Sequence, residues 1–344
     1  MAARLHSCEA GPGLDQKVAF LREAASYTEP AYRVEAVETH MSWVFLLDDF
    51  AYKLKKPICD KPLDCRTLAA RHYLCREELR LNRRLAPEVY LGITPLTLDQ
   101  RGHLALGGDG AVVDWLVRMR RLPDGQMLDY AIRHKALADT DLLRLAARLS
   151  AFYSALPAEP LTPQRYRNRL SRRVLEACGE LLLDAYALPP EQVRAIRAAQ
   201  LAALKRNGPM LDARVRAGRI VEGHGDLRPE HVYLGVPLAI IDCLEFSHDL
   251  RVVDVADELG FLALECERLG APEAGVSLLG HCNRITGDTP APTLVHFYQS
   301  CRATTRAVLA GRHLLDQKFC HSPHWVSRAS HYLRLAEEHI HWCV

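Results

Sequence analysis

The first third of the chain alternates apolar and polar residues in a way that predicts β-strands. Three segments combine this alternation with β-branched and aromatic residues, and a pair of aspartates marks a turn between the last two. A short amphipathic helix, with Val18, Leu21 and Ala25 on one face, precedes them. We therefore expect a helix followed by three antiparallel strands. The strand segments are 32–39, 42–49 and 50–56.

Between Cys65 and Leu85 the apolar residues return at helical spacing, and Pro87 ends the pattern. Strand-like segments follow up to residue 120, and the GGDG sequence at 107–110 is typical of a hairpin turn. Strands, one helix and further strands together predict an α+β domain of about one hundred residues.

After Arg120 the pattern is different, because residues 127–216 have almost continuous helical periodicity. A stretch of short apolar segments and polar, Gly- and Pro-containing loops interrupts it, and helices resume at Val252. We predict three regions. They are an N-terminal extension with a short helix at 1–30, a sheet domain at 31–120 and a helical domain at 121–344.

Composition and charge narrow the class of protein. The 344 residues are 49% hydrophobic, and 44 Lys and Arg against 42 Asp and Glu give a net charge of only +2. This balance favours neither a nucleic acid nor an anionic membrane as the main partner. The 11 cysteines include no C-x-x-C pair, and the start of the chain lacks the apolar core of a signal peptide, so we expect a cytoplasmic protein with reduced thiols.

Two acidic residues on neighbouring loops are the strongest candidates for chemistry. GHGDLRPEH presents Asp226 with Arg228 two residues later, and PLAIIDCLEF ends an apolar segment with Asp242. One carboxylate can accept a proton from a hydroxyl while the other holds a divalent cation on ATP phosphates, which phosphoryl transfer requires. Arg228 would offset charge on the transferred phosphoryl group.

The sequence HGDLRPEH resembles the H-R-D-L-K-P-E-N catalytic loop of protein kinases, with five of eight positions identical. It is more similar to the H-G-D loop of the aminoglycoside phosphotransferase-like small-molecule kinases. The resemblance places the catalytic loop at 222–234 and a metal-binding segment, with Asp242, at 239–246. It also implies that Asp254, in DLRVVDVA, braces the catalytic loop.

The sheet domain carries a second part of the resemblance. FAYK is similar to the V-A-I-K strand of kinases, which implies that Lys53 holds ATP phosphates and that Ala51 covers the adenine. A glutamate on the following helix should pair with this lysine. We favour Glu78 over Glu77, because leucines follow Glu78 at core spacing, and Lys55 stays an alternative to Lys53.

Two further nucleotide contacts follow from the resemblance. The segment ETHMSWVFL, with Ser42, would lie over the phosphates, and LVRMRRLP would bring the backbone near Met119 to the adenine. The implied fold is bilobal and protein-kinase-like, with a small antiparallel-sheet lobe and a larger helical lobe. The implied cofactors are ATP and Mg²⁺, with Mn²⁺ as an alternative, and the implied partner is a small-molecule acceptor.

Several blocks, such as YKLKKP and HGDLRPEH, resemble a subgroup of this family that is often fused to a P-loop kinase domain. The chain has no G-x-x-x-x-G-K-[ST] motif, so we expect any P-loop kinase to be a separate partner. It also lacks G-x-G-x-x-G, D-F-G and A-P-E sequences, which favours the small-molecule kinases over the protein kinases.

His231 is the main departure, because it replaces an asparagine that helps to hold the metal in kinases. Mg²⁺ prefers oxygen ligands. Three interpretations stay open: weak binding of Mn²⁺ or Mg²⁺, a hydrogen bond within the catalytic loop, or a site without activity. Glu245 is a candidate for the missing oxygen ligand.

Other classes of function compete with the kinase interpretation. A non-catalytic, nucleotide-binding regulatory module would explain His231, and a metal-dependent hydrolase would use His224 and Asp226. The hydrolase lacks the additional ligands that such sites gather. His321 and His324 lie close in sequence near the C-terminus, but their spacing matches no standard zinc site.

Overall fold

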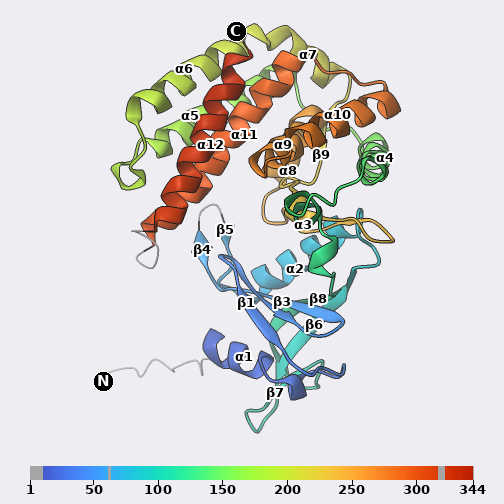
Figure 1. Ribbon diagram of the computed structural model, residues 1–344. Helices are drawn as coiled ribbons and strands as arrows, with labels where there is room; N and C mark the ends of the chain where they lie inside the picture. The colour runs from blue at the N-terminus through green and yellow to red at the C-terminus, as the bar shows by residue number, and fades with distance from the viewer. Residues whose placement is uncertain (1–10, 61–62, 317–321, 344) are drawn as a thin grey trace, which may run out of the picture. The chain divides into compact units, whose positions relative to one another are not determined.

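The computed structural model describes residues 11–60, 63–316 and 322–343. Its chain forms two compact units, which Figure 1 shows as a sheet-containing part and a helical part. The first unit runs to Met127 and also includes His231–Ser247, and the second comprises Leu128–Glu230 and His248–Val344. Residues 231–247 thus group with the sheet-containing unit.

A six-stranded antiparallel sheet forms the frame of the first unit, in the order β1-β2-β3-β8-β6-β7. The three predicted N-terminal strands are present and antiparallel, with Val44 opposite Lys53. The bounds are β1 Glu35–Glu38, β2 Ser42–Leu46, β3 Phe50–Lys55, β6 Tyr90–Leu98, β7 Leu104–Leu106 and β8 Ala111–Arg120. A separate two-stranded sheet pairs β4 (Cys59–Asp60) with β5 (Leu63–Asp64).

The GGDG segment does not close a hairpin between its flanking strands, so that prediction was wrong. Strands β7 and β8 both pair with β6, on opposite sides of it. The chain therefore crosses from one side of β6 to the other. At Gly110 a Cβ atom would overlap the backbone of Leu98, which explains a glycine at this crossing.

The N-terminal helix α1 (Leu14–Leu21) is part of the core of the first unit. Its apolar residues pack with the side chains of the sheet, and Lys17 forms a buried ion pair with Asp114 at 2.7 Å. Arg71 binds the same carboxylate at 2.8 Å. Asp114 thus joins α1 and α2 to strand β8. The shared core consists of Val18, Leu21, Tyr27, Phe45, Leu47, Tyr52, Leu54, Leu96 and Leu116.

Helix α2 (Leu68–Asn82) packs against β6 and β8, and the hydroxyl of Thr67 caps its first turn by accepting from Ala70. Alternation along β3 directs Tyr52 and Leu54 into the core with α1. Lys53 and Lys55 therefore lie on the opposite face, where they meet Glu78 of α2.

Residues 231–247 join the first unit through main-chain hydrogen bonds. A 3₁₀ turn (Pro229–His231) leads into this segment, which forms the short strands β10 (Val232–Tyr233) and β11 (Ala239–Ile240), and these pair with each other. The amide of Leu234 donates to Gln126, and the amide of Cys243 donates to the side chain of Asn82 at 2.8 Å. These bonds attach the segment to the end of the sheet region and to α2.

The second unit is predominantly helical, as the sequence predicts. Its only strands in the described part of the chain are β9 (Ile220–Glu222) and β12 (Val252–Asp254), which pair with each other. The helices are α3 Leu128–Arg133, α4 Asp139–Ala155, α5 Pro163–Leu181, α6 Pro190–Arg206, α7 Gly208–Arg216, α8 His248–Arg251, α9 Val255–Arg268, α10 Pro272–Thr286, α11 Pro292–Arg312 and α12 Pro323–His341. Short 3₁₀ turns lie at Asp184–Tyr186 and His313–Leu315 in this unit, and at Ala24–Ser26 and Asp124–Gln126 in the first unit.

Two apolar clusters hold these helices together. One joins α5, α6, α9, α11 and α12, and the other joins the ends of α5–α7 to β9, β12 and α11. Among the described residues, no helix is both long and apolar enough to cross a bilayer. The predicted fold class, α+β with an antiparallel sheet and a larger helical part, is confirmed.

Candidate active site

A buried cluster of lysines and carboxylates lies on the first unit, between strand β3 and helix α2. Glu78 is fully buried, and its two oxygens contact the ammonium groups of Lys53, at 2.9 Å, and of Lys55. Lys53 also binds Asp242 at 2.7 Å, while Lys55 binds Glu245. The two lysines considered from the sequence therefore share one glutamate, and each has a second acidic partner.

The structure separates the two adjacent glutamates of α2. Glu78 points to the sheet, whereas Glu77 pairs at 2.8 Å with Arg80, one turn along the same helix. Glu77 thus makes the ordinary surface ion pair that its spacing also allowed. The structure brings Glu78 together with Lys53, as expected, but it equally brings it together with Lys55.

Asp242 is held in a backbone conformation that is uncommon for an aspartate. Its φ angle is +61°, in the left-handed region, where residues other than glycine carry a strain cost. The hydroxyl of Tyr90 accepts a hydrogen bond from its amide at 3.1 Å, and Asn82 holds the following residue. A fixed, strained acidic residue is typical of a functional site rather than of a surface loop.

Opposing effects set the charge state of this cluster. Burial alone would lower the pKa of Lys53, but the carboxylates of Asp242 and Glu78 outweigh it and hold that pKa well above its usual range. Burial would likewise raise the pKa of Asp242, yet the ammonium of Lys53 holds it well below its usual range. We expect both groups to be charged near neutral pH.

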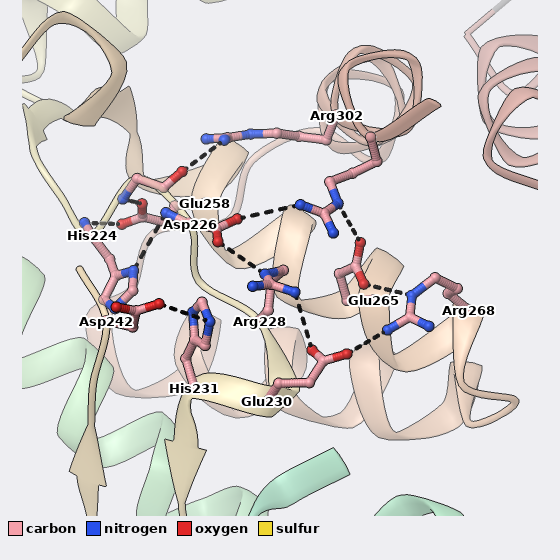
Figure 2. A network of polar contacts seen from close by, with 12 residues as sticks. His224, Asp226, Arg228, Glu230, His231, Asp242, Glu258, Glu265, Arg268 and Arg302 are labelled. Atoms are coloured by element: carbon pink, nitrogen blue, oxygen red, sulfur yellow. Dashed lines mark hydrogen bonds and ion pairs between the residues drawn. The ribbon is translucent and has the colours of Figure 1, made fainter. Parts of the chain in front are cut away.

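His231 lies beside Asp242, with its Nε2 atom 3.5 Å from the second carboxylate oxygen (Figure 2). The main-chain oxygen of His231 accepts from the amide of Ile241. Asp242 has 44% of its side chain exposed, whereas His231 is largely buried. The imidazole therefore faces the oxygen that Lys53 does not occupy.

The remaining residues predicted for the nucleotide lie on the same sheet. Ala51 is buried and stands directly opposite Met119 in the pairing of β3 with β8. Ser42 begins β2 opposite Lys55, and its buried hydroxyl has no hydrogen-bond partner among the described residues. Glu245, considered as a metal ligand, is bound by Lys55 instead.

The loop that carries Asp226 belongs to the second unit and is held by Glu258 of α9. The carboxylate of Glu258 accepts from the amides of His224, at 2.8 Å, and Gly225, and from the hydroxyl of Tyr153 at 2.6 Å. A Cβ atom at Gly223 would overlap this carboxylate, so the loop requires a glycine there.

Asp254 does not brace the catalytic loop in the way we expected. Its carboxylate binds Arg214 of α7 at 2.6 Å, the hydroxyl of Tyr298 at 2.9 Å and the amide of Ala256. It therefore caps α9 and ties it to α7. Glu258, one turn further along the helix, contacts the loop.

Asp226 belongs to a closed ring of alternating charges, most of which Figure 2 labels. Arg228 donates to one of its oxygens at 3.0 Å, and Arg306 lies 3.8 Å from the other. From these arginines the ring continues through two glutamates to Arg268. Its other contacts are Arg228–Glu230 at 3.8 Å, Glu230–Arg268 at 2.8 Å, Arg268–Glu265 at 2.6 Å and Glu265–Arg306 at 3.6 Å.

The ring has two consequences for Asp226. Arg228 and Arg306 place two positive charges beside its carboxylate, the group that would accept a proton. They also fix its orientation. Arg228, predicted to act on the phosphoryl group, binds Asp226 itself in this structure. Arg302 adds a further restraint, since it donates to the carbonyl of Gly225 at 3.2 Å while pairing with Asp257.

Several residues of the site escaped the sequence analysis. Glu258, Glu265, Arg268 and Arg306 lie on helices outside the HGDLRPEH and IIDCLEF segments, and Asn82 and Tyr90 belong to no recognised motif. The one available signal was the presence of acidic residues at buried helical positions of α9. A charged side chain at such a position needs a partner.

The C-terminal histidines do not form a metal site in the described part of the chain. His321 lies outside the described residues, and His324 packs edge-on against Trp325. Over residues 11–60, 63–316 and 322–343, no group of three or more His, Cys, Asp or Glu side chains could hold a metal ion.

Asp242 and His231 supply one carboxylate and one imidazole, which fits a cation that arrives with a nucleotide. Mg²⁺ is commonly bound by one or two carboxylates together with substrate phosphates and water. The oxygen of Asp242 that faces His231 is not the one bound by Lys53. Asp242 would therefore hold the ion, with His231 as a nitrogen ligand or as a hydrogen-bond donor to Asp242.

Comparison with solved structures places the fold. The chain aligns with the aminoglycoside phosphotransferase APH(2'')-IIIa, in its GDP and kanamycin complex, with a TM-score of 0.52 and 14% identity over 94% of this chain and 98% of that one. It aligns with a choline/ethanolamine kinase family protein from Mesorhizobium loti with a TM-score of 0.50 and 15% identity, over 96% and 98% of the two chains. The fold is therefore protein-kinase-like.

Sequence comparison finds longer relatives without an assigned activity. Uncharacterized proteins of Mycobacterium tuberculosis and Mycobacterium bovis are 31% identical over 278 residues, which is 80% of this chain. The match covers 54% of those proteins, so the chain spans about half the length of the curated relatives it matches. No protein-family model matches the chain.

Proposed function

We propose that the chain is an ATP-dependent phosphotransferase that acts on a hydroxyl group of a small molecule. The observation that carries this proposal is the position of Lys53, whose ammonium contacts Glu78 at 2.9 Å and Asp242 at 2.7 Å. A lysine placed between a helix glutamate and a loop aspartate is the arrangement that kinases use to hold nucleotide phosphates. Asp226, held between Arg228 and Arg306, would supply the base.

Each residue has one task in the proposed reaction. Asp226 would accept the proton of the acceptor hydroxyl as its oxygen attacks the γ-phosphorus, and ADP would leave. Lys53 would hold the phosphates, and Glu78 would fix the lysine. A divalent cation at Asp242, when bound, would neutralise phosphate charge. Arg228 would position Asp226 and balance its charge.

The structures similar in fold support the donor and acceptor classes. One contains GDP and kanamycin, and another belongs to a choline/ethanolamine kinase family. We propose ATP as the phosphoryl donor and a hydroxyl as the acceptor group. GTP should be assayed beside ATP, because one of the structures similar in fold contains GDP. The buried hydroxyl of Ser42, without a partner among the described residues, supports a ligand near the start of β2. The subgroup and a P-loop kinase partner stay predictions from the sequence.

The experiment is nucleotide turnover with a panel of hydroxylated acceptors, in Mg²⁺ and in Mn²⁺. Asp226→Asn should lower kcat by about 10²- to 10⁴-fold while ATP still binds. Lys53→Met should weaken ATP binding. Lys56→Met is the matched control, because Lys56 pairs with Glu38 at 2.6 Å and contacts neither Glu78 nor Asp242 in any ion pair of the described residues, so it should not weaken ATP binding. Acceptor-dependent turnover that survives Asp226→Asn unchanged would refute the proposal.

A non-catalytic nucleotide-binding module is the second candidate. It is favoured by His231, which faces the Asp242 oxygen that a metal would use, while Lys53 occupies the other oxygen. Such a module would bind ATP and turn over no acceptor. His231→Asn restores the residue type of the resembling kinases, so it should raise metal-dependent turnover if the histidine limits the metal site. An unchanged, negligible rate in both forms would favour the module.

A further inference from the structure

Helix α5 carries three arginines on one face whose guanidinium groups converge on Asp249 of α8. One Nη atom of Arg169 and one of Arg172 each lie 3.9 Å from a different oxygen of that carboxylate. Arg173 donates to the main-chain oxygen of Asp249 at 2.8 Å. We call Arg169, Arg172 and Arg173 the α5 arginine cluster.

Arg169 is buried without a full set of partners. Only 9% of its side chain is exposed, and its Nε and Nη2 atoms have no hydrogen-bond partner among the described residues. Buried guanidinium groups are normally paired through several of their five donors. Buried donors without acceptors are expected where a ligand can supply those acceptors.

The cluster has more positive charge than its neighbours neutralise. Burial lowers the pKa of Arg169, and burial together with the charges of Arg169 and Arg302 lowers the pKa of Arg173 to about 10. Two of the acidic neighbours are exposed, whereas Asp257, whose charge also acts on Arg173, is buried and already paired with Arg302. Asp249 is 71% exposed, and Glu176, 3.9 Å from Arg172, is 69% exposed. Solvent screens such pairs, so an incoming anion can replace them.

The cluster lies beside the loop that carries Asp226. Asp249 is two residues before Arg251, whose main-chain oxygen accepts from the amide of Gly223 at the start of the loop. The charge of Arg302 contributes to lowering the pKa of Arg173, and Arg302 donates to the carbonyl of Gly225. Both routes link the cluster directly to the residues that position the proposed base.

We propose that the α5 arginine cluster binds an oxyanion group of the acceptor, so that the acceptor is a hydroxylated carboxylate or phosphate compound. This inference rests on the proposed phosphotransferase function. Carboxylates and phosphates match the paired donors of a guanidinium group. A cationic amine would be repelled at the same place and would bind no unpaired donor of Arg169.

A binding experiment tests the anion site without turnover. Inorganic phosphate is titrated calorimetrically into the protein saturated with a non-hydrolysable ATP analogue, which occupies the nucleotide site. Arg169→Met should weaken phosphate binding at least tenfold, and Asp249→Asn should strengthen it severalfold by removing a competing carboxylate. Arg165→Met, an exposed arginine of the same helix, is the control for net charge and should leave it unchanged.

Stability separates a binding role from a structural one. Because Arg169 is buried and its ion pair with the exposed Asp249 is long, at 3.9 Å, Arg169→Met should leave the melting temperature unchanged or raise it. Loss of phosphate binding at constant or higher stability supports the inference. Phosphate binding equal to wild type in Arg169→Met, or no binding in any form, overturns it. A large fall in melting temperature would assign Arg169 to the fold and also overturn it.

A turnover experiment compares matched acceptors under the same conditions. Glycerol 3-phosphate is compared with glycerol, and glucuronate with glucose and glucosamine. The anionic member of each set should have a kcat/KM at least tenfold higher, and Arg169→Met should remove this preference mainly by raising KM. Equal or better turnover of the neutral or amino compounds overturns the inference while the phosphotransferase stands. Intact phosphate binding with no phosphorylated acceptor would instead overturn the phosphotransferase proposal, and the acceptor assignment with it.

Discussion

Glu78→Gln is the sharpest test of the buried cluster in the first unit. Glu78 is fully buried, Lys55 is only 1% exposed, and both glutamate oxygens contact ammonium groups. Glutamine keeps the volume and removes the charge, so two lysines lose a shared partner. Removing one member of a buried ion pair typically costs about 3–5 kcal/mol. Because Lys53 and Lys55 each retain another carboxylate, we expect about 3 kcal/mol.

Hydrogen exchange measured by mass spectrometry suits this test, because a chain of two units need not unfold in one step. Peptides from β3 and α2 should lose protection equivalent to about 3 kcal/mol. Peptides from α11, in the second unit, serve as the internal reference. The matched control is Glu77→Gln, which removes a surface pair with Arg80 and should cost no more than about 1 kcal/mol. Equal loss of protection in the two variants would refute the reasoning.

Three further predictions concern the second unit. Gly275→Ala should destabilise it by about 1–3 kcal/mol, because the new Cβ would lie 2.8 Å from the backbone of α9. Gly280→Ala in the same helix has room and should stabilise it by about 0.5–1 kcal/mol, so equal melting temperatures would contradict this account. Arg214→Met should lower the free energy of unfolding in urea by about 3–5 kcal/mol, because it leaves the fully buried carboxylate of Asp254 without its cation. Arg216 is 69% exposed, so Arg216→Met should change this free energy little. Glu258→Gln should reduce kcat of the proposed reaction by about 10²-fold and leave the KM for ATP unchanged, because Glu258 holds the loop that orients the base. An unchanged kcat would show that the loop keeps its conformation without the charge of Glu258.

Local sequence patterns predicted much of the architecture. Alternation in residues 32–56 gave the three antiparallel strands, and helical spacing gave α2 and the helical second unit. These properties depend on neighbours along the chain, which the sequence displays directly. The GGDG prediction failed because the pairing partner of a strand is a long-range choice, and β6 accepts both β7 and β8.

The sequence also determined which residues were candidates, since Asp226, Asp242 and Lys53 stood in motifs with a recognisable order. Their catalytic roles stay predictions. The choice of Glu78 as the buried partner followed from the leucines spaced after it. That same reasoning could not show that Lys55 shares this glutamate, because the position of α2 over β3 is set by packing between distant segments.

Only the tertiary structure determined the surroundings of the proposed base. Glu258 rather than Asp254 holds the loop, and the ring around Asp226 takes Arg268 and Arg306 from two different helices. The sequence likewise could not show which arginine of α5 has buried donors without a hydrogen-bond partner, because that helix contains many arginines. Sequence patterns report the periodicity of burial, whereas the partner of a buried charge depends on which helices pack together and at what rotation.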